Sequence, residues 1–513
     1  MSDDESDPTH LMCVRDYIHR NAEQSPDQTY LIDPAAGRSL TFAECQSEVQ
    51  RISSLIDAQG IKAGETVAFA FSNSVDSALT ILGLLYGGYV ATAINLVAGE
   101  STIEYVLQHS EAQLVIGDQK GRDLVAPALQ SGASSAKIID RTELMNTHPR
   151  RTVEPNPVDT DTEGLLMYTS GTTGRPKGVV LTQMSLLAGG KNAVNAHELS
   201  SADCGLCVLP FYHINAFCVS LMGSLVSRSS LVVPERFSVS SFWEIVRDQK
   251  CSWFSVVPTQ ISYLLHDAET DKNVSSQCNL LRFGRSASAP LSPDMHAAFE
   301  KRFGIPLIET MGLTETAAPI LSNPMPPGIR KIGSPGIAYG NEVMIGSKRQ
   351  NEVERGEEGE ILVRGDNVLK HYRNNVEATN EAITKDDWFR TGDLGRMDED
   401  GYVFVTGRLK ELIIKGGENI APREVDEALY CHPDVIEAAA FAVHCPNYGQ
   451  RVEAGVKLTV GSTTSRQDLL NLCREKLGAF KSPDAIYILM DLPKGPSGKI
   501  QRIKLAEIIS QQS

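Results

Sequence analysis

The stretch GLLMYTSGTTGRPKG, residues 164–178, decides how this chain folds and what it binds. Residues 164–168 form an apolar run of strand length, and the polar remainder is a loop that leaves the strand. The loop combines glycines, which let backbone N–H groups approach an anion, with hydroxyl donors and one lysine charge. The groups that it offers come from Thr169, Ser170, Gly171, Thr172, Thr173, Gly174 and Lys177. The stretch predicts a triphosphate site at the end of a strand.

This loop differs from the other common phosphate loop, the Walker A motif. In a Walker A loop a GK pair is followed by Ser or Thr. Here Lys177 follows Pro176 and precedes Gly178. A P-loop kinase is therefore disfavoured. The alternative to a triphosphate site is a polar surface loop that binds no ligand.

Apolar runs of strand length alternate with helix-length amphipathic stretches outward from this loop. The runs are 66–71, 114–116, 164–168, 205–209, 231–233 and 253–257. The alternation indicates an α/β fold with mostly parallel sheets. Residues 78–96 carry no charge, but Gly87 and Gly88 interrupt them. A buried helix followed by a buried strand is therefore favoured there over a membrane span.

The sequence pattern of the chain changes after about residue 343. Three short strand-like runs separated by turns indicate a small β-rich subdomain, and an α+β unit of about a hundred residues follows, a common domain size. The three runs are 342–345, 359–364 and 402–405; the later unit has helical stretches at 424–429 and 468–477 and strands at 435–443 and 453–458. We place a hinge in the charged link at 408–410, between an N-terminal domain, 1–408, and a mobile C-terminal domain, 409–513.

Composition limits the class of protein. The chain has 513 residues, with 48 basic and 64 acidic side chains and a net charge of −16. The length predicts at least two domains, and the acidic balance argues against a nucleic-acid partner. Ten scattered cysteines, with one CxxC pair at 204–207 and no Cys/His run, favour reduced, packed thiols in the cytoplasm over a zinc site. The acidic first ten residues do not read as a secretory signal.

Four further motifs follow the glycine-rich loop in the order of the chain. They are MGLTE (311–315), RTGD (390–393), GRLK (407–410) continued by KGG (415–417), and PKGPSGK (493–499). With these motifs the chain resembles the adenylate-forming superfamily of acyl-CoA synthetases, peptide-synthetase adenylation domains and luciferases. The resemblance covers residues 40–504, and the ordered set is far more specific than any one motif.

The resemblance implies roles for individual residues in a first, adenylating step. Lys499 contacts the substrate carboxylate and ATP, because two anions react only if a cation spans both. Glu315 holds Mg²⁺, a hard cation that prefers carboxylate and phosphate oxygens. Asp393 and Arg408 contact the ribose, although an Asp that only caps a turn is the alternative for Asp393. The other nucleotide contacts are Thr169, with a catalytic role as well, the loop residues 170–174, Lys177, Ser288, Thr310, Met311, Gly312 and Thr314.

A second set of residues is implied for the transfer to coenzyme A. Lys410 is the hinge residue, and Gly416 and Gly417 let the chain pass close to the CoA arm. Lys415 and Arg423 are candidates for the CoA phosphates, but exposed basic residues are commonly only solvated.

Two weaker matches leave alternatives open. His213, in PFYHIN (210–215), either steers the thiol or gates the acyl pocket, or is structural, as a lone histidine commonly is. Arg285, in RSASAPL (285–291), either points into the pocket and pairs with a second acidic group of the substrate, or points outward into solvent. We favour the outward orientation. Two departures from the family pattern are Met311, where a tyrosine usually stacks on adenine, and Gln183, where a histidine is usual.

These observations predict an ATP-dependent carboxylic acid–CoA ligase that uses ATP, Mg²⁺ and coenzyme A. The substrate class is a small or medium organic acid, with a polar or dicarboxylic acid as one option. Two alternatives remain: an adenylating enzyme that loads a carrier protein or an amine, and a nucleotide-binding protein that has lost catalysis.

Overall fold

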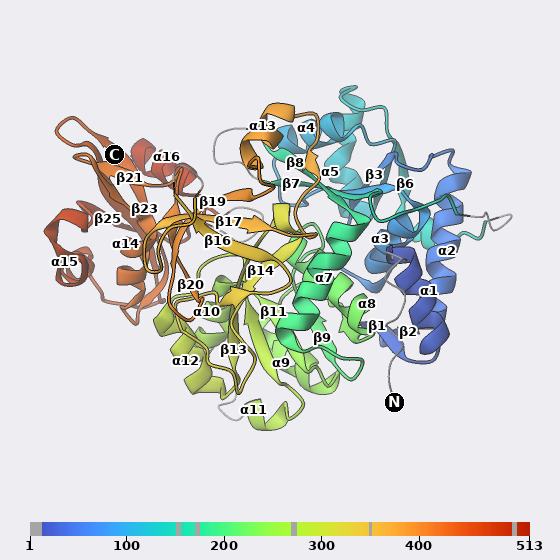
Figure 1. Cartoon of the computed structure of the whole chain (residues 1–513), viewed down its shortest axis with the longest axis horizontal. Coiled ribbons are helices and arrows are strands. Elements are labelled where there is room, and N and C mark those ends of the chain that lie inside the picture. The colour runs from blue at the N-terminus through green and yellow to red at the C-terminus, as the bar shows by residue number, and fades with distance from the viewer. Residues whose placement is uncertain are drawn as a thin grey trace.

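The strand before the glycine-rich loop lies inside a seven-stranded sheet (Figure 1). Its strands are, in order, β18 (His371–Tyr372), β8 (Lys177–Thr182), β7 (Glu163–Thr169), β4 (Val90–Ala93), β3 (Thr66–Ala70), β5 (Leu114–Gly117) and β6 (Lys137–Asp140). β3 to β7 pair in parallel, and β8 and β18 add antiparallel strands at one edge. The computed structural model describes residues 13–149, 155–169, 175–267, 274–347, 351–494 and 500–512.

A second, nine-stranded sheet lies beside the first. Its order is β15 (Ile337–Ala338), β14 (Ala318–Ser322), β13 (Leu307–Leu313), β12 (Phe283–Ser286), β11 (Trp253–Val256), β9 (Cys204–Cys207), β10 (Ser230–Val232), β1 (Thr29–Asp33) and β2 (Arg38–Thr41). The strands from β13 to β1 in this order are parallel, and only the edges are antiparallel. The prediction of an α/β fold with mostly parallel sheets is confirmed.

Helices cover both sheets. They are α1 (Val14–Gln24), α2 (Phe42–Ala58), α3 (Val75–Gly87), α4 (Glu100–Ser110), α5 (Gln119–Gln130), α6 (Arg141–Asn146), α7 (Gln183–His197), the π-helix η1 (Asn215–Met222), α8 (Gly223–Ser227), α9 (Val239–Asp248), α10 (Pro258–His266), α11 (Val274–Gln277), α12 (Pro293–Phe303), the 3₁₀-helix η2 (Thr314–Thr316) and α13 (Val376–Ala382). α7 runs through the centre of the molecule (Figure 1) and packs against β7 and β8 of one sheet and β14 of the other.

The uncharged segment 78–96 forms the buried helix and strand that its glycines predict. α3 ends at Gly87, and Gly88 follows with φ of +77°, a left-handed conformation that suits glycine. The chain then enters β4, all of whose residues are buried. No helix in the described part of the chain is long and apolar enough to cross a membrane.

The predicted β-rich subdomain and C-terminal α+β unit are also present. A four-stranded antiparallel sheet contains β16 (Glu342–Gly346), β17 (Gly359–Arg364), β19 (Phe389–Met397) and β20 (Val403–Arg408). The C-terminal unit contains β21 (Ile413–Lys415), β22 (Glu418–Ile420), α14 (Pro422–Tyr430), β23 (Val435–Cys445), β24 (Gly449–Leu458), α15 (Arg466–Lys481), β25 (Ala485–Ile488) and α16 (Arg502–Gln512). It occupies the left of Figure 1, and its sheet has its own apolar core.

One ion pair ties α16 to the rest of this unit. Arg502 Nη2 lies 2.6 Å from Asp426 Oδ2, and Asp426 Oδ1 accepts the backbone N–H of Ala440 at 2.6 Å. Asp426 is buried, which raises the pKa of its carboxyl, while the nearby Arg502 charge opposes that rise. The Arg502 charge therefore offsets part of the cost of burying this carboxylate.

Replacing Arg502 by methionine is expected to lower the free energy of unfolding of this unit by about 3 kcal/mol, because it leaves a buried charge without its partner. The loss should shrink as pH falls: protonation of Asp426 removes the buried charge, and its pKa in the folded variant lies above the unfolded value. Urea unfolding at pH 7 and pH 5 measures both effects. Arg474→Met, at an exposed position of α15, is the control; equal losses in the two variants would contradict the prediction.

Candidate functional site

The glycine-rich loop connects β7 and β8, which pair antiparallel up to Thr169 and Lys177. The two strands therefore hold the ends of the loop next to each other. Tyr168, just before it, is anchored by a hydrogen bond of 2.9 Å between its hydroxyl and Nδ1 of His109. The loop residues Ser170, Gly171, Thr172, Thr173 and Gly174 lie outside the described residues, and their contacts to phosphate stay predictions.

Glu315 lies in η2, directly after β13. Gly312 is required in that strand, since a Cβ there would meet the carbonyl oxygen of Ala318 at 2.1 Å. Tyr372 donates its hydroxyl to Glu315 Oε1 at 3.0 Å, and the backbone N–H of Leu369 donates to the Glu315 carbonyl at 2.7 Å. These contacts fix the backbone and one carboxylate oxygen, and they leave Oε2 as an oxygen of the hard type that Mg²⁺ prefers.

Tyr372 also connects Glu315 with the glycine-rich loop. The Lys177 ammonium lies over the Tyr372 ring, 4.7 Å from its centroid, a cation–π geometry. Burial and the Glu315 charge raise the pKa of Tyr372, so its hydroxyl remains a donor. The lysine of the loop and the carboxylate of MGLTE, 138 residues apart in sequence, therefore share one tyrosine.

Asp393 and Arg408 form an ion pair across neighbouring strands. They are paired residues of β19 and β20, with Arg408 Nε 2.5 Å from Asp393 Oδ1 and Nη2 3.3 Å from Oδ2. Burial opposes the charge of Arg408, but attraction to Asp393, Glu411 and Glu315 outweighs it and raises the pKa of the guanidinium. Glu315 therefore interacts electrostatically with Arg408. The side chain of Asp393 is buried, 8% exposed, and not a solvated turn cap.

The residues predicted to face adenine lie on adjoining strands. Thr310 donates its hydroxyl to the carbonyl of Ser286 at 3.3 Å and thereby ties β13 to β12. Ser288 follows β12 with φ of +72°, in the left-handed region, and its hydroxyl accepts from Asn215 Nδ2 at 3.4 Å. Met311 is half-buried and packs against the apolar residues between β14 and the four-stranded sheet.

The structure corrects the outward orientation favoured for Arg285. This side chain is 1% exposed, held by Asn215 of η1 and Ser255 of β11. The segment 283–286 is a strand, β12, buried on both faces. Flanking strands bury it although its own residues, FGRS, carry little apolar surface.

His213 is half-buried beside η1. Its ring contacts that of Tyr212, with centroids 4.7 Å apart, and its carbonyl accepts the N–H of Phe217. Gln183 has a packing role: it is buried, accepts from the backbone of Val14 at 3.1 Å and donates to the carbonyl of Leu85 at 3.2 Å.

The residues predicted to meet coenzyme A lie in the C-terminal unit. Gly416 and Gly417, with φ of +59° and +87°, form the turn between β21 and β22. The expectation that an exposed basic residue is only solvated does not describe Lys415. Its side chain is 7% exposed, and its Nζ lies 3.4 Å from Asp484 Oδ2. Arg423 pairs with Glu427 and donates to the carbonyl of Val405 at 2.7 Å.

Contacts also join the tail loop of this unit to the nine-stranded sheet. Lys494 lies 2.7 Å from the buried Glu437 and 3.5 Å from the hydroxyl of Tyr263, on α10. Ser262, beside Tyr263, donates to the carbonyl of Ile436 at 3.5 Å. Lys499 lies outside the described residues, but the described start of its loop rests against α10.

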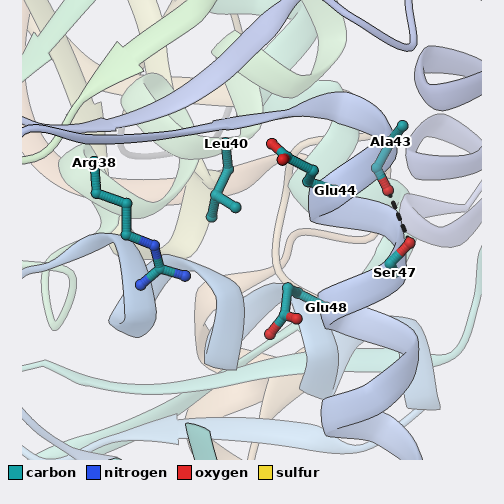
Figure 2. Close-up of a pocket in the computed structure, with 6 residues that line it drawn as sticks. All are labelled: Arg38, Leu40, Ala43, Glu44, Ser47 and Glu48. Atoms are coloured by element: carbon teal, nitrogen blue, oxygen red, sulfur yellow. Dashed lines mark hydrogen bonds between the residues drawn. The ribbon is translucent and has the colours of Figure 1, made fainter.

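A shallow cavity of about 360 Å³ lies elsewhere, at the start of α2 (Figure 2). It is lined by Arg38, Leu40, Ala43, Glu44, Ser47 and Glu48. Its polar groups already have partners: Arg38 pairs with Asp76 at 2.7 Å, Glu44 accepts the N–H of Thr41, and Ser47 donates to the Ala43 carbonyl. None of the sequence motifs contributes to it, so we do not assign the chemistry there.

Sequence reasoning missed Tyr372, Asn215 and Ser255. A lone tyrosine after a two-residue strand and a single serine in an apolar strand give no local signal. Asn215 stands inside the quoted stretch PFYHIN (210–215), but no role was predicted for it.

Comparisons with known proteins agree with this geometry. The family described as AMP-binding enzyme matches residues 18–373, and the AMP-binding enzyme C-terminal domain matches residues 424–499. Sulfoacetate–CoA ligase of Cupriavidus necator is 43% identical over 491 residues, 94% of this chain and 95% of that protein. Oxalate–CoA ligase of Arabidopsis thaliana is 35% identical over 515 residues, 95% and 96% of the two chains.

Solved structures give the same answer for the fold. ATP-bound MatB from Rhodopseudomonas palustris superposes with a TM-score of 0.88 at 27% identity, covering 98% of this chain and all of that one. O-succinylbenzoate coenzyme A synthetase, MenE, from Bacillus subtilis, in complex with ATP and magnesium ion, superposes with a TM-score of 0.84 at 27% identity, covering 96% and 99%.

Proposed function

This chain belongs to the AMP-binding enzyme family and is an ATP-dependent ligase that joins a small organic acid to coenzyme A; we propose that its residues divide between two steps. The relatives named above act on sulfoacetate and oxalate, and another is a 2-succinylbenzoate–CoA ligase. Each of these acids carries a second anionic group. A carboxylate is a poor acylating agent, so the first step must give its carbonyl carbon a leaving group.

In the first step, a carboxylate oxygen of the acid attacks the α-phosphorus of ATP, and the bond to pyrophosphate breaks. The N–H and hydroxyl groups of residues 169–174 and the Lys177 ammonium bind the phosphates, and Thr314 lies near the α-phosphate. Lys499 bridges the carboxylate and the phosphate oxygens. Mg²⁺, held by Glu315, neutralises part of the triphosphate charge when bound.

The ribose and the adenine of the nucleoside are bound by different parts of the site. The Asp393 carboxylate accepts from the ribose hydroxyls while Arg408 fixes its orientation. Adenine lies between the turn at Ser288 and the strand that carries Thr310, Met311 and Gly312. With Met311 in the stacking position, sulfur–aromatic contact replaces a ring stack.

In the second step, the C-terminal domain, 409–513, rotates about Lys410 and withdraws Lys499. The turn at Gly416 and Gly417 and the Lys415 side chain then approach the coenzyme A arm, and His213 borders the path of the thiol. The thiol sulfur attacks the carbonyl carbon of the acyl-adenylate, the bond to AMP breaks, and a thioester forms. The ten free thiols of the chain support a cytoplasmic setting.

One observation carries the proposal: residues from four motifs converge. Lys177 meets Glu315 through Tyr372, and the charge of Glu315 acts on the Arg408–Asp393 pair. Such a cluster of opposite charges suits a magnesium-bound nucleotide. A protein that had lost catalysis would have no reason to keep all of these groups together.

The test is acid-dependent release of pyrophosphate from ATP over a panel of short acids, followed by chromatographic detection of the acyl-CoA. Pyrophosphate release that requires an acid, and a thioester that requires coenzyme A, is the expected result. If a thioester forms on a carrier protein, or an amide forms with an amine, and no acyl-CoA forms, the acceptor is the carrier protein or the amine and not coenzyme A. No release with any acid would refute the proposal.

A further inference from the structure

A guanidinium group is buried beside the acyl side of the site. Arg285, on β12, is 1% exposed and lies between β11 and the π-helix η1. Its Nη1 donates to Asn215 Oδ1 at 2.8 Å and to Ser255 Oγ at 3.0 Å, and Ser255 donates to the same Asn215 oxygen at 3.1 Å. The three side chains form a triangle of hydrogen bonds, which we call the Arg285 group.

This group contains no negative charge. Among the described residues no carboxylate forms an ion pair with Arg285, and its buried Nε has no hydrogen-bond acceptor. The other buried arginine in the described part of the chain, Arg51, pairs with Glu48, and the half-buried Arg502 and Arg282 pair with Asp426 and Asp203. Burial lowers the pKa of Arg285 to about 9, which leaves it protonated at neutral pH. A buried cation with only neutral partners is unfavourable unless an anion joins it.

The nearest titratable neighbour does not supply that anion. His197, on α7, is fully buried, and burial and the charge of Arg285 lower its pKa to about 3. It is therefore neutral. Its ring lies against Phe283, with centroids 5.2 Å apart.

The Arg285 group is connected to the nucleotide motifs. Asn215 Nδ2 donates to Ser288, which follows β12 by two residues, and Ser286 is tied to Thr310 of β13. Asn215 follows His213 by two residues. The carboxyl ends of parallel strands are where α/β sheets bind ligands, and π-helices such as η1 are frequent at functional sites.

We propose that Arg285, oriented by Asn215 and Ser255, binds a second anionic group on the acid, a carboxylate or a sulfonate, while the reacting carboxylate faces ATP. This inference rests on the proposed function and names its substrate class: short acids with two anionic groups. The planar guanidinium offers two N–H groups in the geometry of an oxyanion. Asn215 and Ser255 are neutral acceptors, so they position the cation without cancelling its charge.

The experiment compares each diacid with a neutral counterpart, a monoacid of about the same size in which an uncharged amide or sulfonamide replaces the second acid group. Pyrophosphate release is measured with malonate against malonamate, succinate against succinamate, and sulfoacetate against sulfamoylacetate. Wild type should favour the dianionic member of at least one pair by about a hundredfold in kcat/KM. Arg285→Gln should lose about a hundredfold on that acid, since truncating one side of a buried charge pair has this effect, and change less than threefold on the neutral counterpart.

Two further variants keep the test decisive. Arg236→Gln makes the same charge change at an exposed position and should behave as wild type. Asn215→Asp keeps Arg285 in place and supplies an internal carboxylate, so it should raise the melting temperature while abolishing the preference for diacids. This variant covers the case in which Arg285→Gln does not fold.

The outcomes separate the two proposals. Equal activation of diacid and half-amide by wild type, or equal losses on both in Arg285→Gln, overturns the role of Arg285 and leaves the ligase assignment standing. An unchanged diacid preference in Asn215→Asp overturns it too. The absence of pyrophosphate release with every acid refutes the proposed function, and the inference with it.

Discussion

Replacing Lys499 by alanine is expected to lower acid-dependent pyrophosphate release about 10²–10³-fold, because a preorganised donor at a developing charge contributes that much to the rate. Both reactants are anions, and Lys499 is assigned to the point where they meet. The thioester step starts from a neutral carbonyl carbon and proceeds after Lys499 has been withdrawn. Transfer from a supplied acyl-adenylate to coenzyme A should therefore stay within a few-fold of wild type.

Stopped single-turnover assays of the two half-reactions measure this split. Lys504→Ala, at an exposed position five residues later, removes the same charge from the same domain and should leave both half-reactions unchanged. Equal losses in the two half-reactions of the Lys499 variant would show a structural role. Unchanged pyrophosphate release would remove Lys499 from the mechanism.

Replacing Asp393 by alanine is expected to lower kcat/KM for ATP about a hundredfold. The substitution removes the acceptor assigned to the ribose hydroxyls, and charged hydrogen bonds contribute about 1.5–3 kcal/mol each. It also leaves Arg408 without the carboxylate that now lies 2.5 Å from its Nε. The guanidinium is then free to turn away from the ribose, so both contacts are lost together.

Initial rates at varied ATP and saturating acid measure the effect, and most of it should appear in KM. Asp393→Asn, which keeps the shape and one acceptor oxygen, should fall between wild type and Asp393→Ala. Asp386→Ala, an exposed aspartate before the same strand, is the control. An Asp393 variant whose KM for ATP matched wild type would separate this ion pair from nucleotide binding.

The strands and helices with strong local signals were predicted well, and those without were not. β3, β5 and β7 are apolar runs, and the buried helix and strand at 75–93 follow from the glycines between them. β12 was not among the predicted strands, because FGRS lacks an apolar pattern. Its neighbours β11 and β13 bury it on both edges, and this tertiary effect has no local signature.

The same division applies to the candidate site. The motifs predict functional roles for Glu315, Asp393, Arg408 and Lys177 without any structure. Tyr372, which joins two of them, could not be identified, since its importance arises only from what it touches. For Arg285 the prediction of a solvated side chain, based on how arginines commonly behave, was wrong.

The amino-acid sequence by itself determined the order of strands and helices, and it predicts the phosphate-binding loop and the set of charged groups for a nucleotide. These properties depend on short stretches, in which spacing and residue type already express the chemistry. The tertiary structure alone decided which side chains meet across long separations. Asn215, Ser255 and Arg285 come from three segments, and only the packing of η1 on the nine-stranded sheet surrounds the guanidinium with neutral acceptors and leaves its charge for an anion.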